Sequence, residues 1–262
     1  MLTLTIGSMR AVSARLPLAR LTERPLSDPA GAVFRLIPAR IPTLEELRLP
    51  AAAARFASFG SGLVLVTGPT GSGKSSTLAA ILDLVNGGTP RHVVTIEDPI
   101  EYVHEDRACS FTQREVGSDT ESFEAALRSA MRQDADLVLV GEMRDYETIR
   151  LALSLAEMGM LVFSTLHTTS ASRTVDRIVE VFPEEQQAQA RAMLAESLQG
   201  ILAQLLLPTR DGKGRIPATE LLFTSTALRS VVREGAAHKI ESMLKAGRAE
   251  GMHLMDDSLY AL

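Results

Sequence analysis

Residues 62–80 read GLVLVTGPTGSGKSSTLAA, an apolar run followed by a glycine-rich turn and an amphipathic stretch. Within this segment, Gly68–Ser75 matches the phosphate-binding P-loop pattern at every fixed position. Leu63–Val66 is typical of a buried strand, and Ser75–Val85 is typical of a helix that the loop opens. A strand, a glycine loop, Lys-Ser and a helix in this order predict a phosphate-binding turn rather than an ordinary glycine-rich connection.

The chemistry of this loop suits a triphosphate. Backbone amides at Gly71 and Gly73 carry no side-chain bulk, so they can close on phosphate oxygens at the positive end of the helix. Lys74 would place a charge between the β- and γ-phosphates, and the Ser75 hydroxyl would bind Mg²⁺. The predicted nucleotide-binding residues are Gly68, Pro69, Thr70, Gly71, Ser72, Gly73, Lys74, Ser75 and Ser76.

Length, composition and charge restrict the class of protein. The chain has 262 residues, enough for one substantial core or two modest ones, with 45% hydrophobic and 23% charged residues, as in an ordinary globular protein. A net charge of −5 does not indicate the broad basic surface that nucleic-acid binding needs, so no nucleic-acid partner is expected. The single cysteine, Cys109, excludes an internal disulfide and a cysteine-built zinc site, and is expected to be a small buried side chain. No apolar run is long enough for a transmembrane segment and the opening residues lack a signal peptide, so a cytoplasmic location is expected.

The chain is expected to be an α/β protein with a mostly parallel sheet, because apolar strands alternate with amphipathic helices in its central part. Two extended patterns near the start, Arg15–Leu21 and Ala32–Ile37, predict a hairpin, and Thr43-Leu-Glu-Glu46 predicts a capping box that opens a short helix. The predicted sections are the hairpin (1–40), a linker with the short helix (41–61), the core (62–208) and a mainly helical region (209–262).

Patterns inside the core predict its individual elements. The strand candidates are Leu63–Val66, His92–Ile96, Leu137–Val140 and Leu161–Ser164. One helix is expected to follow a Ser118-x-x-Glu121 cap with Phe123, Leu127 and Ala130 on one face, and another to carry Ile149, Ala152, Leu153 and Ala156 before Gly159 ends it. Pro183 is expected to start a longer helix that ends near Pro208.

Acidic residues follow the second strand candidate, in Thr95-Ile-Glu97-Asp98-Pro-Ile-Glu101. In an open α/β sheet, ligands bind outside the carboxyl ends of the strands. Carboxylates placed there could hold Mg²⁺ through water or accept a proton from attacking water. A solvated acidic turn is the alternative interpretation.

Two further strand candidates end in polar residues. Leu137–Val140 is followed by Gly-Glu142, where a carboxylate can hold the Mg²⁺ that bridges the phosphates. The fourth candidate leads to His167, which could sense the γ-phosphate as an uncharged hydrogen-bonding group or could simply be structural. If these strand ends converge on one crevice, the functional interpretation is favoured.

These four blocks, in this order and spacing, resemble the P-loop, Asp box, Walker B and His box of the secretion-superfamily ATPases. The segments TIEDPIEYVHE, FTQREVGSDT, LVGEMRDYETIRLAL, STLHTTSASRTVDRIV and Ala227–Glu234 are most similar to the PilT-type branch, the pilus-retraction (twitching motility) ATPases. The extension and type II secretion relatives usually carry a zinc site made of four cysteines. A chain with one cysteine cannot build that site, so the resemblance favours the retraction branch.

The resemblance implies a RecA-like ATPase core that hydrolyses ATP with Mg²⁺, works as a hexamer, and contacts a platform protein at the inner-membrane base of the pilus machine. It implies Ser75 and Glu142 as the metal-binding residues, Glu101 as the base that activates water, with Glu97 second, and His167 as the sensor. Arg20 and Arg35 fall where the family's N-terminal domain offers arginines to a nucleotide, although a solvated strand position is equally compatible with their pattern.

The resemblance also marks a departure. The family carries a complete N-terminal α/β domain before the motor core, whereas only the last hairpin of that domain is expected within 1–40. Two alternatives therefore stay open: a nucleotide-binding regulator or assembly-deficient paralogue without productive turnover, and an extension-type or type II/IV secretion ATPase.

Overall fold

The computed structural model describes residues 3–4, 19–22, 32–36 and 40–262, the first three ranges as backbone strands only. These three strands, β1 (Thr3–Leu4), β2 (Ala19–Thr22) and β3 (Ala32–Leu36), form an antiparallel sheet in the order β1-β3-β2. The predicted pairing of two extended segments is confirmed for β2 and β3, whereas residues 15–18 and 37 lie outside the described residues. The sequence did not predict β1.

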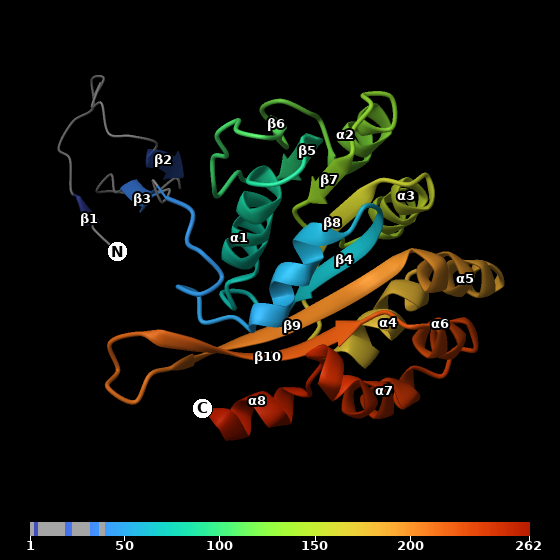
Figure 1. Cartoon of the computed structure of the whole chain (residues 1–262). Coiled ribbons are helices and arrows are strands. Elements are labelled where there is room, and N and C mark those ends of the chain that lie inside the picture. Colours follow the sequence, from blue (N-terminus) through green and yellow to red (C-terminus); the bar gives the residue numbers. More distant parts are fainter. Residues whose placement is uncertain (1–2, 5–18, 23–31, 37–39) are drawn as a thin grey trace.

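A seven-stranded sheet forms the rest of the framework (Figure 1). Its strand order is β10-β9-β4-β8-β7-β5-β6, and every neighbouring pair is parallel except β9 with β10. The strands are β4 (Gly62–Thr67), β5 (His92–Glu97), β6 (Ser110–Glu115), β7 (Leu137–Val140), β8 (Leu161–Leu166), β9 (Leu198–Pro208) and β10 (Arg215–Phe223). All four predicted core strands are therefore confirmed, and the expected mostly parallel α/β fold with them.

Helices cover both faces of this sheet (Figure 1). One face is covered by α1 (Lys74–Asn86) and the 3₁₀ helix η1 (Ala51–Ser58), and the other by α2 (Phe123–Ala130), α3 (Tyr146–Glu157) and α5 (Gln187–Ser197). Because β4, β7 and β8 are covered on both faces, all their residues from Leu63 to Val66, Leu137 to Val140 and Leu161 to Leu166 are buried. This explains why the strands read as continuous apolar runs without alternation.

The predicted faces of α2 and α3 pack as expected, but one cap is wrong. Leu127 and Ala130 are buried, as are the four predicted residues of α3, and Gly159 ends α3 with φ +98°. The cap of α2, however, is Ser122, whose hydroxyl accepts from Ala125 N at 3.1 Å. Ser118 instead lies in the turn after β6, where its own N–H bonds to the Glu115 carbonyl.

The predicted short helix in the linker is also wrong, although its capping box is present. Thr43 Oγ1 accepts from Glu46 N at 3.1 Å, and Glu46 Oε2 accepts from Thr43 N at 2.9 Å. The chain then makes a single turn, because Arg48 has a positive φ of 55° and Pro50 follows. The helical segment in this region is η1, which starts at Ala51.

The largest error concerns residues 183–223. The helix that begins after Pro183 ends at Ser197, and Leu198–Pro208 is the strand β9, inserted between β4 and β10. The region after residue 209 begins with β10 rather than with helices. A short apolar run buried on both faces has the same pattern in a strand and in a helix, so periodicity could not distinguish them.

The remaining helices follow β8 and β10, and those after β10 lie in the region that was predicted to be mainly helical. They are α4 (Ala171–Glu180), η2 (Glu184–Gln186), α6 (Thr226–Arg233), η3 (Ala237–Lys239), α7 (Ile240–Ala246), η4 (Gly247–Glu250) and α8 (Met255–Ala261). Cys109 is buried, as predicted. Within the described residues, no helix is both long and apolar enough to cross a bilayer.

Candidate nucleotide-binding site

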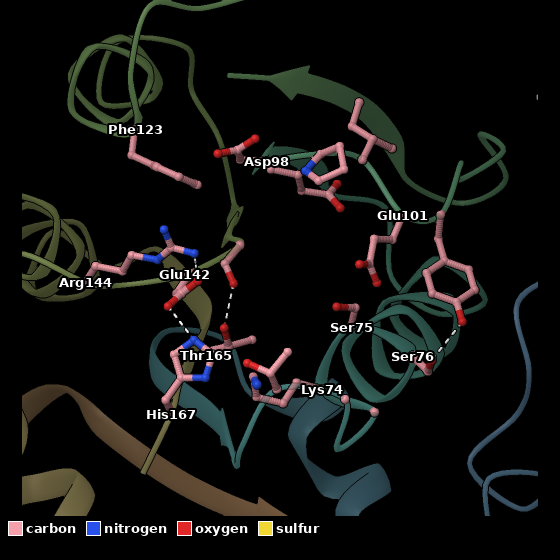
Figure 2. A pocket seen from close by; sticks show the side chains of 18 of the residues that line it. Lys74, Ser75, Ser76, Asp98, Glu101, Phe123, Glu142, Arg144, Thr165 and His167 are labelled. Carbon is pink, nitrogen blue, oxygen red and sulfur yellow. Dashed lines mark hydrogen bonds and ion pairs between the residues drawn. The ribbon is translucent and has the colours of Figure 1, made fainter. Parts of the chain in front are cut away.

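A cavity of about 510 Å³ opens at the carboxyl ends of the parallel strands (Figure 2). Its size is within the ~300–1,000 Å³ typical of small-molecule sites. The P-loop and the ends of β5, β7 and β8 supply most of its walls. The lining residues that the sequence predicted are Thr70, Gly71, Gly73, Lys74, Ser75, Ser76, Glu97, Glu101, Glu142 and His167.

The strand order explains this convergence. β8 lies between β4 and β7, and β5 lies beyond β7, so four consecutive strands end beside one another. The glycine-rich turn follows β4, and His167 follows β8. Glu142 follows β7, and the acidic cluster lies at the end of β5. Residues far apart in the sequence therefore meet at one edge of the sheet, as the rule for open α/β sheets requires.

The P-loop has the backbone conformation that its glycines permit. Gly71 and Gly73 have φ values of 79° and 90°, in the left-handed region that side chains disfavour. Gly73 is the N-cap of α1, whose first residue is Lys74, so the loop amides lie at the positive end of a 13-residue helix. A Cβ on Gly71 would meet no atom within 4 Å, so the space beside this residue is open. This arrangement fits a phosphate group.

Lys74 bonds to the loop itself. Its Nζ donates to the carbonyl oxygens of Gly68 at 2.8 Å and Pro69 at 3.1 Å. Burial lowers the pKa of Lys74 from its ordinary value, and the charges of Glu142 and Glu101 act in the opposite direction. Two weak carbonyl partners can be exchanged for the phosphate oxygens of a ligand, which are stronger acceptors.

Glu142 is held by two cationic or potentially cationic groups (Figure 2). Its Oε1 lies 2.6 Å from His167 Nε2, and its Oε2 lies 2.7 Å from Arg144 Nη2. Burial acts to raise the pKa of Glu142, but the hydrogen bonds and charges of Arg144 and His167 outweigh it and hold that pKa below its ordinary value. The carboxylate is therefore ionised and ready to hold a cation near neutral pH.

The acidic cluster after β5 separates into two environments. Glu97 accepts hydrogen bonds from Thr95 Oγ1 at 2.8 Å and Gln113 Nε2 at 3.3 Å, and burial raises its pKa. Glu101 lines the cavity on the side of Ser75 (Figure 2). The interpretation as a purely solvated turn does not hold for Glu97, because this residue is fixed inside the cavity wall.

Close backbone contact fixes the strand ends. Thr165 Oγ1 donates to the Gly141 carbonyl at 2.6 Å, and Gly141 N donates to the Ile96 carbonyl at 2.8 Å. A Cβ on Gly141 would lie 3.2 Å from Ile96 O and 3.4 Å from Glu97 Cα. Glycine therefore lets the strand that carries Glu142 approach the strand that carries Glu97.

The cavity also contains residues that the sequence analysis missed. These are Pro99, Ile100, Tyr102, Phe123, Gly141, Arg144, Thr165 and Arg215, whereas Asp98, which also lines the cavity, belongs to the predicted acidic cluster. Arg144 could have been found, because it follows Glu142 by two residues at a predicted strand end. Arg215 and Phe123 carry no local signal, since long-range packing brings them to the site.

Three of the predicted phosphate-loop residues do not line the cavity among the described residues. Gly68 and Pro69 face Lys74 through their carbonyl groups, and Ser72 is buried beneath the loop. Arg20 and Arg35 lie opposite each other as backbone partners in the β2–β3 ladder. Their role towards a nucleotide stays a prediction.

The donor set suits Mg²⁺ as well as phosphate. Ser75, Glu101 and Glu142 line the same cavity and offer hydroxyl and carboxylate oxygens, which are the ligands that Mg²⁺ prefers. No cluster of three or more His, Cys, Asp or Glu side chains arranged for a metal occurs among the described residues. Mg²⁺ is usually bound by one or two carboxylates together with substrate phosphates, so such a cluster is not required for it.

A parallel sheet with a P-loop after a central strand, and with carboxylates at the ends of neighbouring strands, defines a RecA-like P-loop ATPase. The chain belongs to the family described as type II/IV secretion system protein, whose pattern matches residues 19–258. It is 52% identical over 233 residues to the type IV pilus retraction ATPase PilT of Pseudomonas aeruginosa, which covers 89% of this chain and 67% of the relative. It is also 52% identical over 232 residues to a twitching motility protein of Neisseria gonorrhoeae, covering 88% of this chain and 62% of that one.

Solved structures agree with this assignment. The pilus retraction motor PilT with bound ADP superposes with a TM-score of 0.83 at 47% identity, covering 88% of this chain and 65% of the other. The Legionella pneumophila ATPase DotB superposes with a TM-score of 0.77 at 31% identity, covering 90% of this chain and 66% of the other. The chain thus spans about two thirds of the length of these relatives.

Proposed function

We propose that this chain is an ATP-hydrolysing motor that powers type IV pilus retraction, and hence twitching motility, as a hexamer. The observation that carries the proposal is the convergence of Lys74, Ser75, Glu142 and His167 on one cavity. The 52% identity to a pilus retraction ATPase supports the choice of pilus retraction as the work performed. The proposed location is the cytoplasmic face of the inner membrane, where the chain would contact the pilus platform protein.

Each residue has a defined task in this proposal. Loop amides and Lys74 bind the phosphates, and Ser75 and Glu142 hold Mg²⁺, either directly or through water. The metal, when bound, neutralises charge on the transferred phosphoryl group. Glu101 accepts the proton of the attacking water, with Glu97 as the second choice. His167 leaves Glu142 to sense the γ-phosphate, and Arg20 and Arg35 stabilise the transition state. Motion would come from opening and closing of the cleft between the motor core and an N-terminal domain.

The test is the ATPase rate per chain measured against protein concentration. A hexameric motor predicts a steep rise as the ring assembles. Lys74→Ala and Glu142→Ala should each lower the rate by ~10²–10³, the loss typical for one electrostatic contact to the transition state. Lys245→Ala is the matched control, because Lys245 pairs with Glu241 on the surface of α7. Nucleotide binding by a monomer without turnover would contradict the motor and favour the binding regulator.

A deletion strain distinguishes retraction from the remaining alternative. Loss of twitching with retained surface pili is expected for a retraction motor. Loss of the pili themselves would instead support an extension or secretion ATPase.

A further inference from the structure

A buried glutamine on β9 lies directly beneath the P-loop. β9 runs parallel to β4, and Ala203 pairs with Thr67, the last residue of β4. Gln204 is therefore level with Gly68, and a Cβ on Gly68 would lie 2.2 Å from the Gln204 carbonyl oxygen. Only 2% of Gln204 is exposed. A polar side chain buried in this way requires partners for both ends of its amide.

Both ends of that amide bind the phosphate loop and its helix. Gln204 Nε2 donates to the Ser72 carbonyl oxygen at 2.5 Å, and Gln204 Oε1 accepts from Thr77 Oγ1 at 2.9 Å. Ser72 and Thr77 are themselves buried. The Thr77 hydroxyl and the Ser72 carbonyl together fix which way the amide points, because a flipped amide would place two oxygens against each other.

The bond to Ser72 has a consequence for the next residue. The Ser72 carbonyl and the Gly73 N–H belong to one planar trans peptide unit, so they point in opposite directions. A carbonyl held inward by Gln204 turns the Gly73 N–H outward. Gly73 lines the nucleotide cavity and is the N-cap of α1, where an anion is favoured by the helix dipole.

We propose that Gln204 is a positioning residue for nucleotide binding, which directs the Gly73 amide towards a phosphate by holding the Ser72 carbonyl. Its chemical target is the diphosphate or triphosphate group, and it acts through Gly73 without touching the ligand. The inference rests on the proposed nucleotide-binding function. An apolar side chain of similar length would fill the same space but would leave the Ser72 carbonyl without this donor.

Gln204→Met tests this distinction because it keeps the shape and removes both hydrogen bonds. Titration with ADP should show a Kd raised by about tenfold, because a buried polar group loses its partner. In ¹H–¹⁵N spectra, the shift of the Gly73 amide on ADP addition should shrink. A merely structural role would not change that shift. Gln199→Met is the matched control: Gln199 is on the same strand, at the other end of β4 next to Gly62, and its substitution should leave ADP binding unchanged.

Circular dichroism verifies that each variant is folded. Thr77→Val is the second variant, since it removes only the hydroxyl that orients the amide, and it should raise the Kd for ADP by about two- to fivefold. Unchanged ADP affinity in Gln204→Met, or in Thr77→Val if the first variant does not fold, would overturn the inference while wild-type binding stands. Failure of the wild-type chain to bind ADP would overturn both the inference and the proposed function.

Discussion

The two sides of β4 differ in what they contribute to the site. On one side, β8, β7 and β5 end in His167, Glu142 and the acidic cluster, whose side chains face the cavity. On the other side, β10 contributes Arg215 to the lining, and β9 supports the P-loop from beneath through Gln204. In the proposed function, the first side supplies the reacting and metal-binding groups, and the second holds the loop that faces them through hydrogen bonds. Changes on the two sides should therefore affect different measurements.

The largest effect is expected on the acidic side, from Glu101→Gln. Removal of the proposed general base should lower the rate of ATP hydrolysis by ~10²–10⁴. The Kd for ADP should hardly change, because the P-loop is untouched. Glu97→Gln is the comparison variant. Its carboxylate is already engaged by Thr95 and Gln113, so a smaller loss of rate is expected. A larger loss of rate in Glu97→Gln than in Glu101→Gln would indicate that Glu97 is the base.

The loop that follows the acidic cluster contains a buried histidine. His104 is buried in it and stacks on Phe111 with ring centroids 4.7 Å apart. Burial lowers the pKa of His104 to about 4, opposed by Asp83 and reinforced by Arg107. In the unfolded chain, His104 takes up a proton near pH 6.5, whereas in the folded chain it does so only near pH 4. The free energy of unfolding is therefore highest above pH 6.5, and it falls by about 3 kcal/mol as the pH is lowered towards 4.

His104→Phe keeps the ring stacking and removes the titration. Chemical denaturation between pH 7 and pH 4 should show a flatter fall of the unfolding free energy than in the wild-type chain. Equal slopes in the two proteins would mean that His104 has the same pKa in the folded and unfolded chains, and hence that burial in the loop does not lower it.

The smallest of these effects is expected on the β9 side, from Gly200→Ala. A Cβ there would lie 2.5 Å from Phe56 Cε1 and 2.7 Å from the Leu222 carbonyl oxygen. Overpacking of this kind costs about 1–3 kcal/mol in the free energy of unfolding. The ATPase rate of the folded fraction should be retained, because no cavity residue is changed. Gly214→Ala, where a Cβ would meet only Thr209 at 3.6 Å, is the control. A lost rate with unchanged stability would remove the distinction between the two sides.

The errors of prediction follow the same division. β4, β5, β7 and β8 were found because each is an apolar run bounded by a glycine, an acid or a polar turn. β9 was taken for helix because Leu198–Pro208 follows a true helix without a break signal, and because burial on both faces removes the alternation that marks a strand. Gln204 was missed for the same reason. A glutamine in a helix has no special meaning, whereas a glutamine inside a buried strand must bind something.

Short motifs are enough to find the P-loop, to recognise the family and to identify the candidates Lys74, Ser75, Glu101, Glu142 and His167, because each of them lies within a motif that has its own local signal. The folded chain was needed to show that β8 lies between β4 and β7, that Arg144 and His167 hold Glu142, and that Gln204 holds the loop. Strand order and buried contacts depend on pairing between segments far apart in the chain, which local periodicity does not encode.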